Sequence, residues 1–84
     1  MSKPTLDDCV FLCLSNGEWW TFWEIQNEIK IRENKFFGEP SISAAIRNLR
    51  KHRCRVKYNL KMTGEVVARR RRLEGKGYQY KLIS

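Results

Sequence analysis

The sequence predicts an α+β fold in which three helices precede a β-hairpin, with a short strand before the second helix. Apolar residues recur at helical spacing through residues 6–49 and then alternate with polar residues along residues 54–62 and 78–82. Turn residues interrupt the helical part at Asn16-Gly17 and at Gly38-Glu39-Pro40. With 84 residues, 42% of them hydrophobic, the chain can form one domain, residues 1–84, around one modest core.

Two capping boxes mark the first two helices. Thr5 and Asp8 have the spacing at which a hydroxyl and a carboxylate cap a helix reciprocally, and Thr21 and Glu24 repeat it. The short strand covers Trp19-Trp20, directly before the second cap. In the third helix the apolar residues fall on one side and the other side carries no acidic residue. The predicted helices cover residues 5–15, 21–33 and 41–52.

The remaining residues predict three strands. Cys54, Val56, Tyr58 and Leu60 alternate with polar and basic residues, which is typical of a half-buried strand over residues 54–61. A hairpin formed by residues 65–72 and 77–83 follows. Residues 65–74 also fit one or two turns of helix, but the β-branched Val66-Val67 favours the strand.

Charge is divided unevenly along the chain. Residues 1–39 carry four basic and seven acidic side chains, a balance of −3, whereas residues 40–84 carry thirteen basic and two acidic ones, a balance of +11. Together they give the formal net charge of +8. Solubility alone is served by interspersed signs, so this division indicates a surface that binds a polyanion, with nucleic acid the leading candidate.

Other features exclude several classes of protein. The first residues have no signal-peptide pattern and no stretch is long enough to span a membrane, so we expect a cytoplasmic, nucleoid-associated protein. Three cysteines argue against a disulfide framework. Cys9, Cys13, His52 and Cys54 could be read as a zinc site, but their spacing is not that of a zinc finger and the first two fall on a core stripe, so we expect no metal and no cofactor.

At this point the chain resembles the winged helix-turn-helix family of DNA-binding domains, over nearly its whole length. The resemblance rests on the Trp19-Trp20-Thr21 strand before the second helix, on residues 40–50 as a recognition helix, and on the glycine-tyrosine entry to the last strand at Gly77-Tyr78. The loop of residues 34–40 is longer than the turn of a tight helix-turn-helix. The resemblance implies a small bacterial or phage-type (prophage) transcription regulator.

The function expected is sequence-specific binding of double-stranded DNA, with the third helix in the major groove and an arginine-rich wing on the backbone or in the minor groove. Base-reading residues are expected to be Ser43, Ala44, Arg47 and Asn48. Phosphate or wing contacts are expected from Ser41, Arg50, Lys51, Arg53, Arg55, Lys57, Arg69, Arg70, Arg71, Arg72 and Lys76.

Catalysis is not expected, because the sequence shows no glycine-rich phosphate loop, no Ser/His/Asp set and no paired acidic motif. Three other functions stay open. The tryptophans Trp19, Trp20 and Trp23 suggest a protein-interaction module or a homodimer, with Trp19 and Trp23 as the partner surface. Attraction to phosphates alone would also suit a non-specific architectural DNA binder or an RNA binder.

Overall fold

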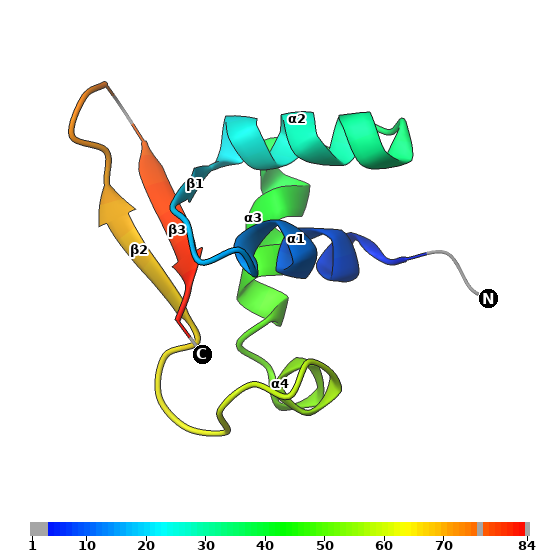
Figure 1. Ribbon diagram of the computed structural model, residues 1–84, viewed down its shortest axis with the longest axis vertical. Helices are drawn as coiled ribbons and strands as arrows, with labels where there is room; N and C mark the ends of the chain where they lie inside the picture. The colour runs from blue at the N-terminus through cyan, green and yellow to red at the C-terminus, as the bar shows by residue number, and fades with distance from the viewer. Residues whose placement is uncertain (1–3, 76, 84) are drawn as a thin grey trace.

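The structure is a computed structural model that describes residues 4–75 and 77–83. It is an α+β fold with four helices and a three-stranded antiparallel sheet (Figure 1). The helices lie on one side of the sheet, and α3 runs behind α1 and α2 in this view. In chain order the elements are α1 (Leu6–Leu14), β1 (Trp20–Thr21), α2 (Phe22–Glu33), α3 (Glu39–Asn48), α4 (His52–Lys57), β2 (Val67–Arg71) and β3 (Tyr78–Leu82).

Both predicted capping boxes are present. The Thr5 hydroxyl accepts a hydrogen bond from the Asp8 N–H at 3.2 Å, and the Asp8 carboxylate accepts one from the Thr5 N–H at 2.9 Å. Thr21 and Glu24 make the same reciprocal pair at the start of α2. Each box satisfies two backbone groups that a helix start leaves without partners, so local sequence alone defines these two starts.

The third helix is shorter than predicted at its C-terminal end. It begins at Glu39, with Gly38 as its cap, and ends at Asn48 rather than at residue 52. Beyond this end, the guanidinium of Arg55 donates to the carbonyl oxygen of Arg50 at 2.7 Å. The chain turns at residues 49–51 and starts α4.

The strand predicted over residues 54–61 is wrong, because the structure forms the helix α4 there. In a helix Cys54 and Tyr58 share a face, and both pack inward: Cys54 is buried and the Tyr58 ring stacks on Phe11 with centroids 4.2 Å apart. Val56, which an alternating strand would bury beside them, is 60% exposed. The expected three helices are therefore four.

The predicted hairpin of the last two strands is confirmed, and so is the strand at residues 65–72. The sheet order is β1-β3-β2, and β3 pairs antiparallel with both neighbours. Val67 lies opposite Leu82, Arg69 opposite Tyr80, and Arg71 opposite Tyr78. Since residues directly opposite share a face, this register fixes which arginines of β2 face the helices.

The core lies between the three longest helices and the inner face of the sheet. Of the two loop phenylalanines, Phe37 packs against the core and Phe36 is exposed. The three cysteines are buried as free thiols, and burial raises the pKa of Cys13 to about 11. The largest fully buried side chains are Val10, Cys13, Leu14, Ile25, Ile29, Ile42, Leu49, Val66 and Val67.

Candidate nucleic-acid interface

The solvent-facing side of α3 is built from small residues and one arginine. Ser41 and Arg47 are exposed, and Ser43 and Ala44 are half-buried. Ile42, Ala45 and Ile46 face the core, so helical periodicity turns the small residues outward. Arg47 makes no ion pair with the residues that the structure describes, which leaves its guanidinium available to an external anion.

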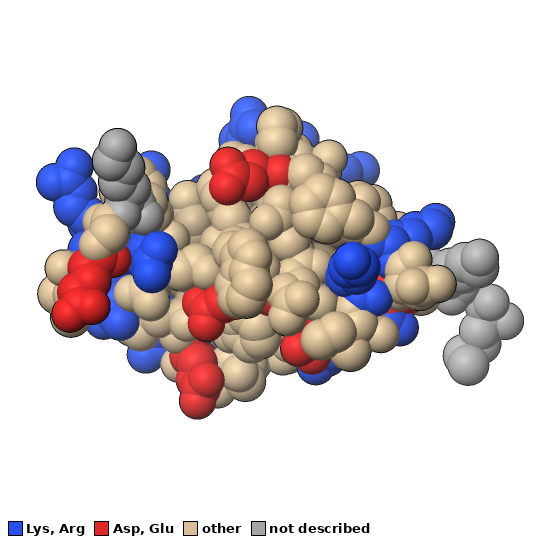
Figure 2. Space-filling view, turned by 90° about the horizontal axis from the view of Figure 1, so that it is seen from above, with Lys and Arg blue, Asp and Glu red and all other residues tan. Residues whose placement is uncertain are grey.

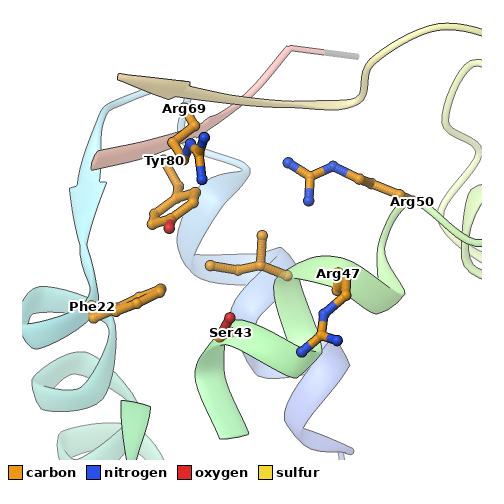
Figure 3. Close-up of a pocket in the computed structure, with 7 residues that line it drawn as sticks. Phe22, Ser43, Arg47, Arg50, Arg69 and Tyr80 are labelled. Atoms are coloured by element: carbon orange, nitrogen blue, oxygen red, sulfur yellow. The ribbon is translucent and has the colours of Figure 1, made fainter. Parts of the chain in front are cut away.

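A hollow of about 230 Å³ separates α3 from the sheet (Figure 3). Ser43 and Arg47 lie on its helix side, Arg69 reaches into it from β2, and Arg50 enters from the turn after α3. Its lining carries three arginines and no carboxylate among the described residues. The volume is below the range typical of small-molecule pockets, ~300–1,000 Å³. Phe22, stacked on Tyr80 with centroids 5.0 Å apart, closes its inner end with Ile46.

The arginines of β2 divide between the two faces of the sheet. Arg69 and Arg71 share a face with Tyr80 and Tyr78, which is the face directed at the helices. The Arg69 guanidinium lies over the Tyr78 ring at 4.6 Å, a cation–π contact that holds its position. Arg70 points to the opposite face, where it bonds Gln79 at 2.9 Å and covers the Trp19 ring. Arg69 and Arg71 therefore lie on one face of β2 and Arg70 on the other.

Two of the predicted phosphate contacts are occupied within the protein. Arg50 donates to a Glu65 carboxylate oxygen at 2.7 Å and to the Val67 carbonyl at 3.2 Å, which ties the turn after α3 to β2. This arginine holds the pKa of Glu65 below its usual range. Arg55 donates to the carbonyl oxygens of Arg50 and Lys61. Both side chains therefore hold the fold together.

Lys57 is likewise engaged inside the protein. Its ammonium forms an ion pair with Asp8 at 2.8 Å, and the Tyr58 hydroxyl donates to the same carboxylate oxygen. These two contacts, the Lys57 one first, hold the pKa of Asp8 well below its usual range. Lys57 thereby joins α4 to α1.

Asn48 was expected to read bases, but its side chain turns toward α1. Its amide nitrogen lies 3.4 Å from one carboxylate oxygen of Asp7 and 3.5 Å from the other. The residue is half-buried at the last position of α3. Arg47, one residue earlier and 100° around the helix, is exposed instead.

The other predicted contact residues occupy the surface. Lys51 and Arg53 are exposed around the start of α4 and make no ion pair with described residues. Arg71 is exposed on β2, and Arg72 follows it at the start of the hairpin turn. Lys76 lies outside the described residues.

Acidic side chains lie mainly on another part of the surface, the face formed by α2 (Figure 2). In Figure 2, which looks down onto α2, acidic side chains lie mainly across the middle of the face and basic ones around its edges, including the hairpin end at the left. The polyanion-binding face predicted from the charge division therefore does not include the outward side of α2. Arg47 and Arg69, two cations of the basic half, instead line the hollow between α3 and β2.

The three tryptophans do not form one patch. Trp20 packs against the core, and its indole N–H donates to Asn16 at 3.0 Å. Trp19 lies under Arg70 and Lys81, with the Arg70 guanidinium 4.3 Å from its ring centre. Trp23 is 70% exposed on α2. Of the partner surface proposed from sequence, Trp23 alone remains largely open to solvent.

Two residues near the hairpin turn were missed by sequence reasoning. Tyr78 is the ring on which Arg69 rests, and Leu73 is 94% exposed at the tip of the turn. The Tyr78 contact was recoverable from the sequence, since the antiparallel register brings the start of the last strand beside the arginine run. For Leu73, the signal in the sequence was a leucine within a basic turn.

Within the described part of the chain, no three His, Cys, Asp or Glu side chains are grouped so that they could hold a metal ion. No helix among the described residues has the length and apolar character needed to cross a membrane. Comparison of the chain with protein-family models, with curated proteins and with solved structures found no match.

Proposed function

We propose that this protein binds double-stranded DNA sequence-specifically and acts as a transcription regulator. In the proposed complex α3 enters the major groove and the β2–β3 hairpin is a wing on the neighbouring backbone or minor groove. The helices and antiparallel hairpin are compatible with a winged-helix arrangement, in which α4 is an addition between α3 and the wing.

One observation supports this proposal most strongly. Arg47 of α3 and Arg69 of β2 face the same open hollow, whose described lining contains no acidic side chain. Arg47 is unpaired by any described carboxylate, whereas Arg50 and Lys57, also in the basic half, are neutralised by Glu65 and Asp8. Two cations that are open to solvent, Arg47 and Arg69, thus lie where a helix and a hairpin converge.

The proposed roles follow from side-chain chemistry. Ser43 and Ala44 are small enough to let the helix backbone approach base edges closely. Arg47 can form two parallel hydrogen bonds to guanine O6 and N7, the commonest specific contact in the major groove. Arg69 and Arg71 on the inner face of the sheet are suited to phosphates, which position the protein without reading sequence.

The test is selection of the purified protein against a pool of random DNA duplexes at near-physiological salt, followed by sequencing. An enriched motif supports a sequence-reading regulator, and a paired motif with a spacing of about 10 base pairs adds a dimer. Binding without enrichment contradicts sequence-specific reading and leaves an architectural DNA binder. Preferential binding of RNA duplexes in direct competition also contradicts the proposal.

A second candidate function is a protein-interaction module, favoured by the outward side of α2. Trp23 and Ile31 lie eight residues apart on this helix, and each is 70% exposed. Tryptophan is enriched at the energetic centres of protein interfaces. Absence of any duplex binding, together with protection of Trp23 from solvent by a protein partner, would favour this function.

A further inference from the structure

The tip of the β2–β3 hairpin exposes a leucine within a cationic segment. Leu73 is 94% exposed and directly follows the run of four arginines, residues 69–72, of which the first three belong to β2. Leaving a leucine in water forgoes the stabilisation that burial of its side chain would give. Single exposed apolar residues are common on surfaces. The surroundings of Leu73 distinguish it from them.

Leu73 belongs to a cluster that combines apolar and cationic groups. A shallow hollow at the tip is lined by Leu73, the half-exposed ring of Tyr78, and Arg71 and Arg72. Two glycines complete the lining, Gly75 with φ +82° and Gly77 with φ +101°. These left-handed positions favour glycine, and the missing side chains keep the tip narrow.

The positive charge of the cluster favours an anionic partner surface. The arginines of β2 favour a polyanion, and the apolar Leu73 requires a partner with apolar surface between its charges. The minor groove of DNA has both, because arginine is attracted to its negative potential and base steps accept apolar side chains as wedges. Glu74, exposed beside Leu73, is repelled by this negative potential, so the electrostatic attraction has to come from the arginines that precede Leu73.

We propose that Leu73 is an apolar wedge that the hairpin inserts at a base step in the minor groove, unstacking the step and bending the duplex. This inference rests on the proposed function, because it assumes that the protein binds duplex DNA. The arginines beside Leu73 position the tip by phosphate and groove contacts. The wedge bends the DNA toward the major groove, by about 20–90° as for other wedge proteins.

The experiment measures bending and affinity separately. A duplex of about 30 base pairs carrying the selected motif, or a random sequence if none is enriched, is labelled at both ends for energy transfer. The wild type is compared with Leu73→Ala, with Leu73→Met and with the control Ile31→Ala, which removes another highly exposed apolar side chain on α2. Folding is checked by circular dichroism; Leu73 makes little contact with the rest of the chain, so its variants are expected to fold.

We expect the wild type, Ile31→Ala and Leu73→Met to bring the duplex ends together, and Leu73→Ala to leave the duplex nearly straight. Affinity of Leu73→Ala is expected to change by less than about tenfold, since the lost contact is offset by the avoided cost of deformation. A netropsin-type minor-groove ligand should abolish the wild-type bend. Base unstacking, seen as increased 2-aminopurine fluorescence at the bent step, should disappear with Leu73→Ala.

Three results would overturn the wedge. In the first, the wild type would bind the duplex but leave it straight. In the second, Leu73→Ala would bend the duplex as strongly as the wild type does. In the third, the protein binds vesicles of anionic lipid in a Leu73-dependent way and leaves bound duplexes straight, which would assign the leucine to a membrane surface. Failure to bind any duplex would overturn the proposed function itself. The affinity measurement distinguishes this outcome from the three results above.

Discussion

The hydroxyl of Tyr58 donates a hydrogen bond to the carboxylate of Asp8, fifty residues earlier in the chain. Lys57 reaches the same carboxylate oxygen, so one acidic side chain of α1 binds two consecutive residues at the end of α4. Asp8 also caps α1 through the Thr5 N–H. One residue that the sequence identifies as a local cap thus also fixes the position of α4.

Asp8 should make stability depend on pH in the acid range. Its pKa is lower in the folded protein than in the unfolded chain, so its stabilising effect is complete above the unfolded value, about 3.9, and is lost as pH falls through the folded value. Asp8→Asn is expected to lower the free energy of unfolding by about 1 kcal/mol at pH 7. Urea unfolding at pH 7, 5 and 3 should show this difference shrinking only at the lowest pH; a constant difference would contradict it.

Arg50 is expected to contribute to the free energy of unfolding through its contacts within the protein. Arg50→Ala removes the bonds to Glu65 and Val67 and should cost about 1–2 kcal/mol. Lys51→Ala is the matched control, because Lys51 is exposed and should change stability by less than about 0.5 kcal/mol. Thermal unfolding of both variants measures the difference. Equal stability of the two would show that the Arg50 contacts contribute little.

Arg47 and Asn48 are neighbours with different expected roles. Arg47→Ala should weaken binding to the preferred DNA site by about 1–3 kcal/mol and reduce discrimination against other sites. Asn48→Ala should leave site preference unchanged, because its amide faces Asp7. Repeating the duplex selection with each variant checks this. Uniform loss of affinity on all sequences for Arg47→Ala would remove it from base reading.

Arg71 is expected to contact a phosphate. Arg71→Gln should weaken binding to all duplexes alike and reduce the slope of log K against log salt by about 0.9, the value for one phosphate contact. Titrations at several salt concentrations give the slope. Lys35→Gln, in the loop after α2, is a control with the same loss of charge and should leave the slope unchanged. Parallel changes in both variants would indicate net charge as the cause.

Trp23 should dominate the solvent-accessible tryptophan fluorescence. It is 70% exposed, whereas Trp20 packs on the core and Trp19 lies under two cations. Trp23→Phe is therefore expected to remove most of the acrylamide-quenchable emission without changing the fold. Trp19→Phe is the comparison variant. Retention of strong quenching in Trp23→Phe would show that Trp19 or Trp20 is an accessible indole and would contradict the dominance of Trp23.

Sequence predicted the elements whose signals are local. The starts of α1 and α2 depend on hydroxyls and carboxylates three residues apart, and the final hairpin on alternation and glycine turns. The exposed position of Arg47 also followed from the periodicity of its own helix. These features could be read correctly because their partners lie within a few residues along the chain.

Tertiary structure decided what depends on distant partners. Residues 54–58 present apolar groups at spacings that fit either a strand or a helix. In the structure they form a helix, in which Tyr58 and Lys57 contact α1. The sequence of residues 54–58 alone does not predict these contacts. Distant residues also determine which cations stay open, since Glu65 engages Arg50 and Asp8 engages Lys57. In the same way Asp7 holds the amide of Asn48 toward α1. The sequence by itself determined that a basic surface exists; only packing between segments far apart in sequence decided which of its cations are engaged by carboxylates, as Arg50 and Lys57 are.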